Sequence, residues 1–319
     1  MAQHGESYME VVNYMSSVPA GNTNIQKEQL INYFHEGILR HSQDTSSINY
    51  DQKLIPCDVA VMQGWVYANT NPPHLKLRKN IITQQLNQKK YVIVADANLF
   101  RFADDTNAHG YLRYSANGIF PTTGNYFDNI IDTSRCNQIL QHHNISLLPY
   151  KKTGSKIILC CQRNNGWSMK GIPIEDWIIT TVKKIRKYSD RHIIIRAHPG
   201  DRTQRNWTKL PNIQSLLKKN NLSISNTGIP IHQDLVDAWA VVNHNSSSIV
   251  GPIIQGHYAF VTDKEDSQCK DVADDDFSNI ENPKEFNREY WMQLKSMSHW
   301  SFEELKNGQA WNHMRNHLQ

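Results

Sequence analysis

Two strand-like segments that end in polar residues constrain the fold of this chain more than any other feature. The first is the β-branched apolar run 192–195, which ends in Arg196 and His198. The second begins at Val241 and ends in Asn245 and the serines 246–248. Such runs are typical of buried strands in a parallel sheet. Ligands of open α/β sheets bind outside the carboxyl ends of the strands, and these polar groups suit a phosphate. We therefore expect a phosphorylated ligand there.

Alternating strand and helix patterns along the chain predict two α/β domains. In the first half, a strand at 58–63 precedes a glycine turn, a helix at 77–88 and a strand at 90–96. In the second half, the predicted strands are 156–162, 192–195, 222–225, a strand beginning at Val241 and 258–262, and the predicted helices are 174–188, 213–219 and 233–239. This βαβ order predicts parallel sheets and two facing Rossmann-like domains.

The predicted domain boundaries are 1–150, 151–285 and 286–319. The first fifty residues are polar, with one helical pattern at 26–39, and 100–127 has the composition of a long ordered loop region. The last segment is helical, with Ser301 and Glu304 spaced as a capping box, and packing back on the N-terminal domain is one option for it.

Composition excludes several classes of protein. The formal charge of +4 permits a polyanionic partner without requiring one. No signal peptide pattern or membrane-spanning apolar run is present, so we expect a cytoplasmic protein. The five cysteines are scattered, which is unlike a zinc site or a disulfide framework.

The loop 163–171 follows the first strand of the second domain. Its candidate ligand contacts are Arg163, Gly166, Trp167 and Lys170, which have the character of a loop that wraps a diphosphate. An ordinary surface loop is the alternative. The spacing is not that of a P-loop, and no Gly-x-Gly-x-x-Gly follows a strand, which disfavours a dehydrogenase.

The His198-Pro199 pair after one strand and the Ser246-Ser247 pair after a later strand resemble the HP and S-S motifs of bacterial GT-B glycosyltransferases, including sialyltransferases and Kdo transferases. The wider phrases 162–170 and 196–201 are similar to glycosyltransferase-like proteins of large tailed phages. The resemblance covers about residues 155–283. A clear pair of acidic residues followed by glycine, found in the first half of sialyltransferases, is absent from this sequence.

The resemblance implies a nucleotide-sugar-dependent glycosyltransferase with a GT-B-like fold. His198 would stabilise the leaving phosphate, and Ser246 and Ser247 would bind it. The donor would lie on the 151–285 domain, and the acceptor on the 1–150 domain. The full predicted donor site is Arg163, Gly166, Trp167, Lys170, Arg196, His198, Asn245, Ser246, Ser247 and Ser248.

A general base is needed to take the proton of the acceptor hydroxyl. Asp96 is the first choice because it ends a first-domain strand, and Asp104, Asp105 and His109 are competitors. The predicted acceptor contacts are these last three residues together with Arg113 and Tyr114, for which packing is the alternative role. No metal ligands are predicted, and the co-substrate is the nucleotide-sugar, with no other cofactor.

The first prediction for the acceptor is a hydroxylated or hydroxymethylated pyrimidine in phage double-stranded DNA, flipped out of the duplex, in which case the protein would act in the host cytoplasm. A surface polysaccharide or lipopolysaccharide precursor is the alternative within the same class. A CDP-alcohol phosphotransferase and a non-catalytic nucleic-acid-binding module remain as other classes. The sequence does not fix the sugar, the anomeric outcome or the oligomeric state.

Overall fold

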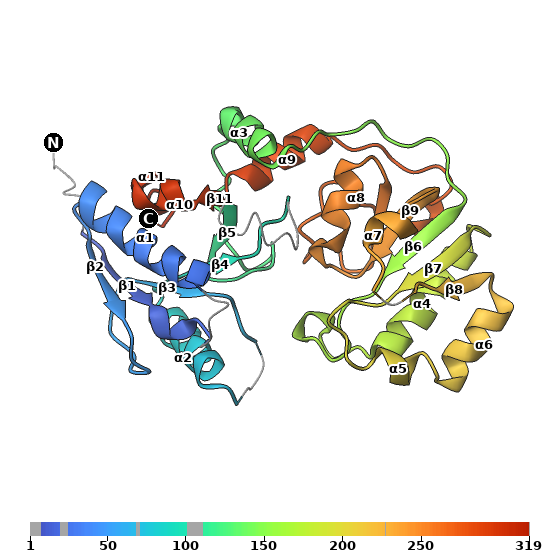
Figure 1. Ribbon diagram of the computed structural model, residues 1–319, viewed down its shortest axis with the longest axis horizontal. Helices are drawn as coiled ribbons and strands as arrows, with labels where there is room; N and C mark the ends of the chain where they lie inside the picture. The colour runs from blue at the N-terminus through green and yellow to red at the C-terminus, as the bar shows by residue number, and fades with distance from the viewer. Residues whose placement is uncertain (1–7, 20–24, 68–70, 101–110, 227, 319) are drawn as a thin grey trace. The chain divides into compact units, whose positions relative to one another are not determined.

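The chain forms two compact units in a computed structural model (Figure 1), which describes residues 8–19, 25–67, 71–100, 111–226 and 228–318. Unit 1 comprises residues 1–143 and 292–319, and unit 2 comprises residues 144–291. The domain boundaries predicted from the sequence were 150/151 and 285/286.

Unit 1 has a six-stranded sheet in the order β11-β5-β4-β3-β1-β2. The first four strands along the chain are parallel, β5 is antiparallel to β4, and β11 is antiparallel to β5. The strands are β1 (Glu10–Tyr14), β2 (Thr45–Asn49), β3 (Val59–Gln63), β4 (Tyr91–Asp96), β5 (Tyr111–Ala116) and β11 (His299–Ser301).

Helices pack on both faces of this sheet because alternate strand residues point to opposite sides. Val11, Val61 and Ile93 pack with α1, α10 and α11 on one face, while Val12 and Met62 pack with α2 on the other. The helices of this unit include α1 (Ile25–His41), α2 (Pro73–Asn87), α3 (Thr133–His143), α10 (Phe302–Lys306) and α11 (Gln309–Arg315), with the short η1 (Met15–Ser17) after β1. Helix α9 (Arg288–Ser296) crosses from unit 2 into unit 1.

Unit 2 has a fully parallel sheet in the order β10-β9-β6-β7-β8. Its strands are β6 (Lys156–Cys160), β7 (His192–Arg196), β8 (Leu222–Ile224), β9 (Ala238–Asn243) and β10 (Tyr258–Val261). The chain moves outward from β6 through β7 to β8 and then returns to β9 on the other side. The topological switch point is therefore between β6 and β9, where α/β sheets bind ligands.

The core of unit 2 on one face of the sheet is built from the apolar stripes of α4 and α6. Ile178, Val182 and Ile213 pack there against Ile157 and Ile193 of the strands. The helices of this unit include α4 (Ile174–Arg186), α5 (Gln204–Trp207), α6 (Pro211–Lys219), α7 (Ile231–Asp234) and α8 (Val250–Ile254). Both units are Rossmann-like, as the sequence predicted.

Some predicted elements are wrong. The predicted helix 233–239 ends at Asp234 as part of the short α7, and Ala238 and Trp239 begin strand β9, in which all six residues are buried. The predicted loop region 100–127 contains strand β5, and the polar first fifty residues contain β1 and β2. The C-terminal segment, predicted as helical, also contains β11.

Other predictions are confirmed. Ser301 and Glu304 form the predicted capping box at the start of α10. Strands β6 and β7 lie within the predicted ranges or one residue beyond them. Within the described ranges, the helices are too short or too polar to cross a membrane.

Candidate functional site

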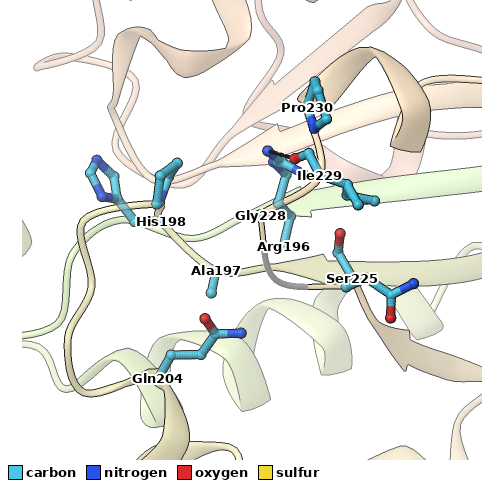
Figure 2. Close-up of a pocket in the computed structure, with 10 residues that line it drawn as sticks. Arg196, Ala197, His198, Gln204, Ser225, Gly228, Ile229 and Pro230 are labelled. Atoms are coloured by element: carbon cyan, nitrogen blue, oxygen red, sulfur yellow. Dashed lines mark hydrogen bonds between the residues drawn. The ribbon is translucent and has the colours of Figure 1, made fainter.

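A pocket lies at the carboxyl ends of β7 and β8 in unit 2. Its volume is about 320 Å³, and Figure 2 shows side chains from both strand ends converging around it. The lining residues are Arg196, Ala197, His198, Pro199, Gln204, Ser225, Asn226, Gly228, Ile229 and Pro230. Apolar ring and aliphatic groups thus share the pocket with two carboxamides, an imidazole and a guanidinium.

The Arg196 guanidinium forms a wall of this pocket, and the carboxylate of Asp234 balances its charge. Its Nη1 donates to Asp234 Oδ2 at 2.7 Å, and its Nη2 donates to the Ile229 carbonyl at 2.7 Å (Figure 2 shows the second bond). The Ser225 hydroxyl donates to the same Asp234 oxygen at 2.7 Å. Arg196 therefore fastens the segment between β8 and β9 to the end of β7.

His198 is arranged as a hydrogen-bond donor. The backbone N–H of Gly200 donates to His198 Nδ1 at 2.9 Å, so the proton of the neutral ring is on Nε2. Burial lowers the pKa of His198, and the nearby Arg163 charge lowers it further, while Asp201 acts in the opposite direction. The imidazole is therefore neutral at pH 7.

Arg163 adds a cation beside His198. A Cβ atom on Gly200 would lie 2.6 Å from Arg163 Nη2, so the absence of a side chain at position 200 lets the guanidinium approach. The Arg163 side chain is exposed, and no carboxylate in the described part of the chain forms an ion pair with it. Its charge is available to a ligand.

A second cluster joins the end of β6 to the ends of β9 and β10. Gln162 Oε1 accepts from the Asn245 N–H at 2.8 Å, and Gln162 Nε2 donates to Ser168 Oγ at 2.8 Å. Asn245 Nδ2 and Lys170 Nζ donate to the same oxygen of Asp263, at 2.9 and 3.1 Å. Lys170 also contacts Asp266, which raises the pKa of Lys170. The charge of Lys170 is thus engaged by two carboxylates.

The serines after β9 form a capped turn. Ser246 is the N-cap of η5 (Ser247–Ile249), and its hydroxyl accepts from the Ser248 N–H at 3.0 Å. Asn243 Nδ2 donates to the Ser246 carbonyl at 2.6 Å. The serine cluster therefore has a capping role.

Comparisons with known proteins bear on the fold. No family model matches the chain, and no curated protein matches it. Among solved structures, it is similar to the β-Kdo 2,4-transferase of KpsC from Thermosulfurimonas dismutans, with a TM-score of 0.52, 11% identity, and 92% of this chain and 90% of that one covered. The fold is GT-B-like.

Two further neighbours have lower scores. The β-Kdo 2,7-transferase of the same KpsC has a TM-score of 0.49 at 12% identity, covering 94% of this chain and 98% of that one. The UDP-GlcNAc 2-epimerase of Methanocaldococcus jannaschii, solved with UDP-GlcNAc and UDP, has a TM-score of 0.35 at 12% identity, covering 94% and 83%.

The structure brings the predicted donor-site residues together in two groups. Arg163, Arg196 and His198 surround the ends of β6 and β7, whereas Lys170 and Asn245 share Asp263. Gly166 and Trp167 begin η4 (Trp167–Met169) in the loop after β6. The sequence did not select Gln162, Gln204, Ser225, Asn226 or Asp234, since isolated polar residues carry no motif.

The predicted acceptor residues lie in unit 1. Asp96 ends β4, and its Oδ2 accepts from Arg113 Nη2 at 2.8 Å. Tyr114 is fully buried, which raises the pKa of its phenol, and it packs in the core of unit 1, which is the alternative role considered for it. Asp104, Asp105 and His109 lie outside the described residues.

Metal-ligating residues do not gather in the described ranges: no three His, Cys, Asp or Glu side chains lie close enough to hold an ion. The five cysteines are buried free thiols. Burial raises the pKa of Cys160 to about 12, so it stays protonated.

Proposed function

We propose that this protein transfers a sugar from a nucleotide-sugar donor to an acceptor hydroxyl, with the donor phosphate at the carboxyl edge of the sheet of unit 2. The observation that carries the proposal is the neutral His198, whose Nε2–H has no acceptor among the described residues, beside the Arg163 cation, which none of these residues pairs. Together they supply a hydrogen-bond donor and a positive charge where a phosphate gains charge.

The reaction breaks the bond between the anomeric carbon of the sugar and the phosphate oxygen, and the electron pair goes to that oxygen. Arg163 and the Nε2–H of His198 stabilise the charge that develops there. The acceptor hydroxyl forms the new bond to the anomeric carbon and loses its proton to a carboxylate, a role that we assign to Asp96 of unit 1. The Arg113 ion pair orients that carboxylate.

The pocket suits the nucleoside part of the donor. Its volume of about 320 Å³ is at the small end of the range of ligand pockets, which is about 300–1,000 Å³. Pro199, Ile229 and Pro230 offer apolar surface to a planar ring, and the carboxamides of Gln204 and Asn226 offer donors and acceptors to its edge. Arg196 forms a wall of this pocket.

For the donor sugar and the acceptor, we propose a Kdo-type sugar and a surface polysaccharide or lipopolysaccharide precursor. The support is the similarity in fold to a β-Kdo 2,4-transferase, together with the HP and S-S motifs. A modified pyrimidine in DNA, the first acceptor suggested by the sequence, gains no support from these neighbours.

The proposal is tested by nucleotide binding followed by transfer. Because a ligand of the native state raises the melting temperature, a thermal-shift series with CMP, UDP, GDP and CDP-glycerol identifies the nucleotide. We expect a shift with one nucleotide that is lost in Arg163→Ala. A transfer assay with the matching sugar, using glycan and hydroxymethylated DNA acceptors, then separates the two acceptor classes. Binding of none of the nucleotides would contradict the proposal, and turnover of CDP-glycerol alone would favour the phosphotransferase.

A further inference from the structure

Unit 1 has its own topological switch point. From β1 the chain passes through α1 to β2 on one side, and β3 and β4 then lie on the other side of β1. The carboxyl ends of β1 and β3 therefore flank the position at which α/β sheets bind ligands. The segments that follow these two ends include Ser17 and Gly64.

One arginine spans these two strand ends. Arg78, from α2, is only 7% exposed. Its Nε and Nη2 donate to the carbonyl of Ser17, which follows β1, at 3.0 and 2.8 Å. Its Nη2 also donates to Oε1 of Gln63, the last residue of β3, at 2.6 Å. The guanidinium is thus fixed at the switch point.

The charge of Arg78 is not neutralised by its contacts. Its three hydrogen bonds go to two acceptors, both neutral, and no carboxylate of the described residues lies within ion-pair distance. Asp96, the carboxylate whose charge raises the pKa of Arg78, is already paired with Arg113. Burial lowers the pKa of Arg78 to about 10, which leaves it protonated at neutral pH. A buried cation without a counter-charge is costly, and a bound anion would offset that cost.

The backbone approaches the Arg78 guanidinium closely at Gly64. Gly64 has a φ of +74°, and a Cβ atom there would lie 2.7 Å from Arg78 Nη1. That nitrogen makes no hydrogen bond to the described part of the chain. The chain continues into Trp65 and Tyr67, and the Tyr67 ring stacks on Phe120 at 5.7 Å. Two aromatic residues thus follow the glycine that contacts the cation, and aromatic rings together with a cation suit a saccharide that carries a negative group.

We propose that Arg78 binds an anionic group, carboxylate or phosphate, of the saccharide acceptor at the switch point of unit 1. The proposal rests on the glycosyltransferase function, since it names the class of acceptor whose hydroxyl Asp96 would deprotonate. Asp96 follows Ala95, whose carbonyl accepts from the Gly64 N–H at 2.9 Å, so the proposed base and the anion site belong to adjacent strand ends.

The test measures binding to the full chain by isothermal titration calorimetry. The probes are a disaccharide ending in glucuronate, its glucose-ended counterpart and the same disaccharide carrying a 6-phosphate. We expect at least one anionic probe to bind at least tenfold more tightly than the neutral one, which also identifies the anion. Equal binding of all three, or no binding, would overturn the proposal.

The variants Arg78→Gln and Arg78→Lys connect the binding to this side chain. The matched control is Arg186→Lys, because Arg186 donates five hydrogen bonds to carbonyls at the opposite, amino-terminal edge of the sheet of unit 2. Loss of a charge-assisted bond predicts about a tenfold to hundredfold weaker binding of the anionic probe in Arg78→Gln. Arg78→Lys should lose less, and Arg186→Lys nothing.

Unchanged affinity in Arg78→Gln would also overturn the proposal. If that variant does not fold, Arg78→Lys and the probe comparison on the unsubstituted protein decide. Nucleotide binding by unit 2 is measured in the same samples. Retained nucleotide binding without anionic preference would refute the acceptor site alone, whereas loss of both would refute the glycosyltransferase function as well.

Discussion

Two arginines at the carboxyl edges of the two sheets differ in what surrounds their charge. In unit 2, Arg196 is paired with the buried Asp234, and the pair forms the wall of a pocket. In unit 1, the hydrogen bonds of Arg78 within the described part of the chain go to a carbonyl and a carboxamide. A strand-end arginine therefore serves two purposes in this molecule: a paired one shapes a site, and an unpaired one leaves its charge for a ligand. Beside Arg196, the free charge comes from Arg163.

The largest expected effect comes from breaking the pair in unit 2. In Asp234→Ala, Arg196 stays buried without a counter-charge, and removing one partner of a buried pair costs about 3–5 kcal/mol. We expect the free energy of unfolding to fall by that amount in urea titrations. The matched control is Glu281→Ala, which removes the partly exposed partner of Arg191 and should cost about 1 kcal/mol or less. Equal losses in the two variants would show that Arg196 does not depend on its pair.

The next effect concerns the group that faces the ligand in unit 2. Removing one donor to a developing negative charge lowers kcat about 10²–10³-fold, and we expect this of His198→Ala. His232→Ala, an exposed histidine on α7, is the control and should keep full activity. Near-ultraviolet circular dichroism checks that both variants are folded. Full activity in His198→Ala would remove this residue from the site.

Acid should destabilise both units, through one buried histidine in each. Burial lowers the pKa of His257 in unit 2 to about 4 and that of His299 in unit 1 to about 3. In the unfolded chain the pKa of a histidine is near 6.5. As the pH falls below that value, the unfolded chain takes up these protons and the folded protein does not, so the free energy of unfolding decreases. Each group contributes about 1.4 kcal/mol per pH unit.

The measurement is urea unfolding at several pH values between 6.5 and 5, where carboxylates titrate little. His299→Gln should reduce the pH dependence of unit 1 and leave that of unit 2 unchanged. The same slope in the variant and the unsubstituted protein would mean that His299 is charged in the native state.

The smallest effect concerns the serine turn after β9. Loss of an N-cap hydroxyl costs about 1 kcal/mol, so Ser246→Ala should lower the free energy of unfolding by that amount. Ser247→Ala, next to it, should stay within about 0.5 kcal/mol. If Ser246 also binds the donor phosphate, its replacement weakens nucleotide binding as well, whereas a purely capping role leaves that affinity unchanged.

The sequence predicted unit 2 better than unit 1 for a physical reason. Strands such as β6 and β7 are β-branched apolar runs bounded by turns, which is the pattern of strands buried on both faces. Strand β2 (Thr45–Asn49) is a polar edge strand, so its composition resembles a loop. The error at β9 has a different cause. A short apolar run is ambiguous between helix and strand, and Ala238 and Trp239 were predicted as helix although they begin this strand.

The site was predictable where a motif marks it. His198 and Arg163 lie where the sequence placed them, at strand ends of unit 2. The partner of Arg196 was not predictable, because Asp234 is 38 residues away and only the folded chain brings it near. Arg78 is one polar residue in the pattern of helix α2, and nothing local distinguishes it from a solvated side chain. The position of Arg78 at the switch point becomes apparent only from its contacts to Ser17, 61 residues earlier.

The composition of unit 1 from both ends of the chain has a consequence for synthesis. Unit 2 is continuous over residues 144–291, whereas the core of unit 1 includes Trp300, Trp311 and Met314 from the last part of the chain. Chains emerge from the ribosome in order, and domains fold as units. Unit 2 can therefore complete its fold on the ribosome while strand β5 still has an open edge, which closes only when β11 emerges. The second half of the sequence can thus complete its fold before the first half.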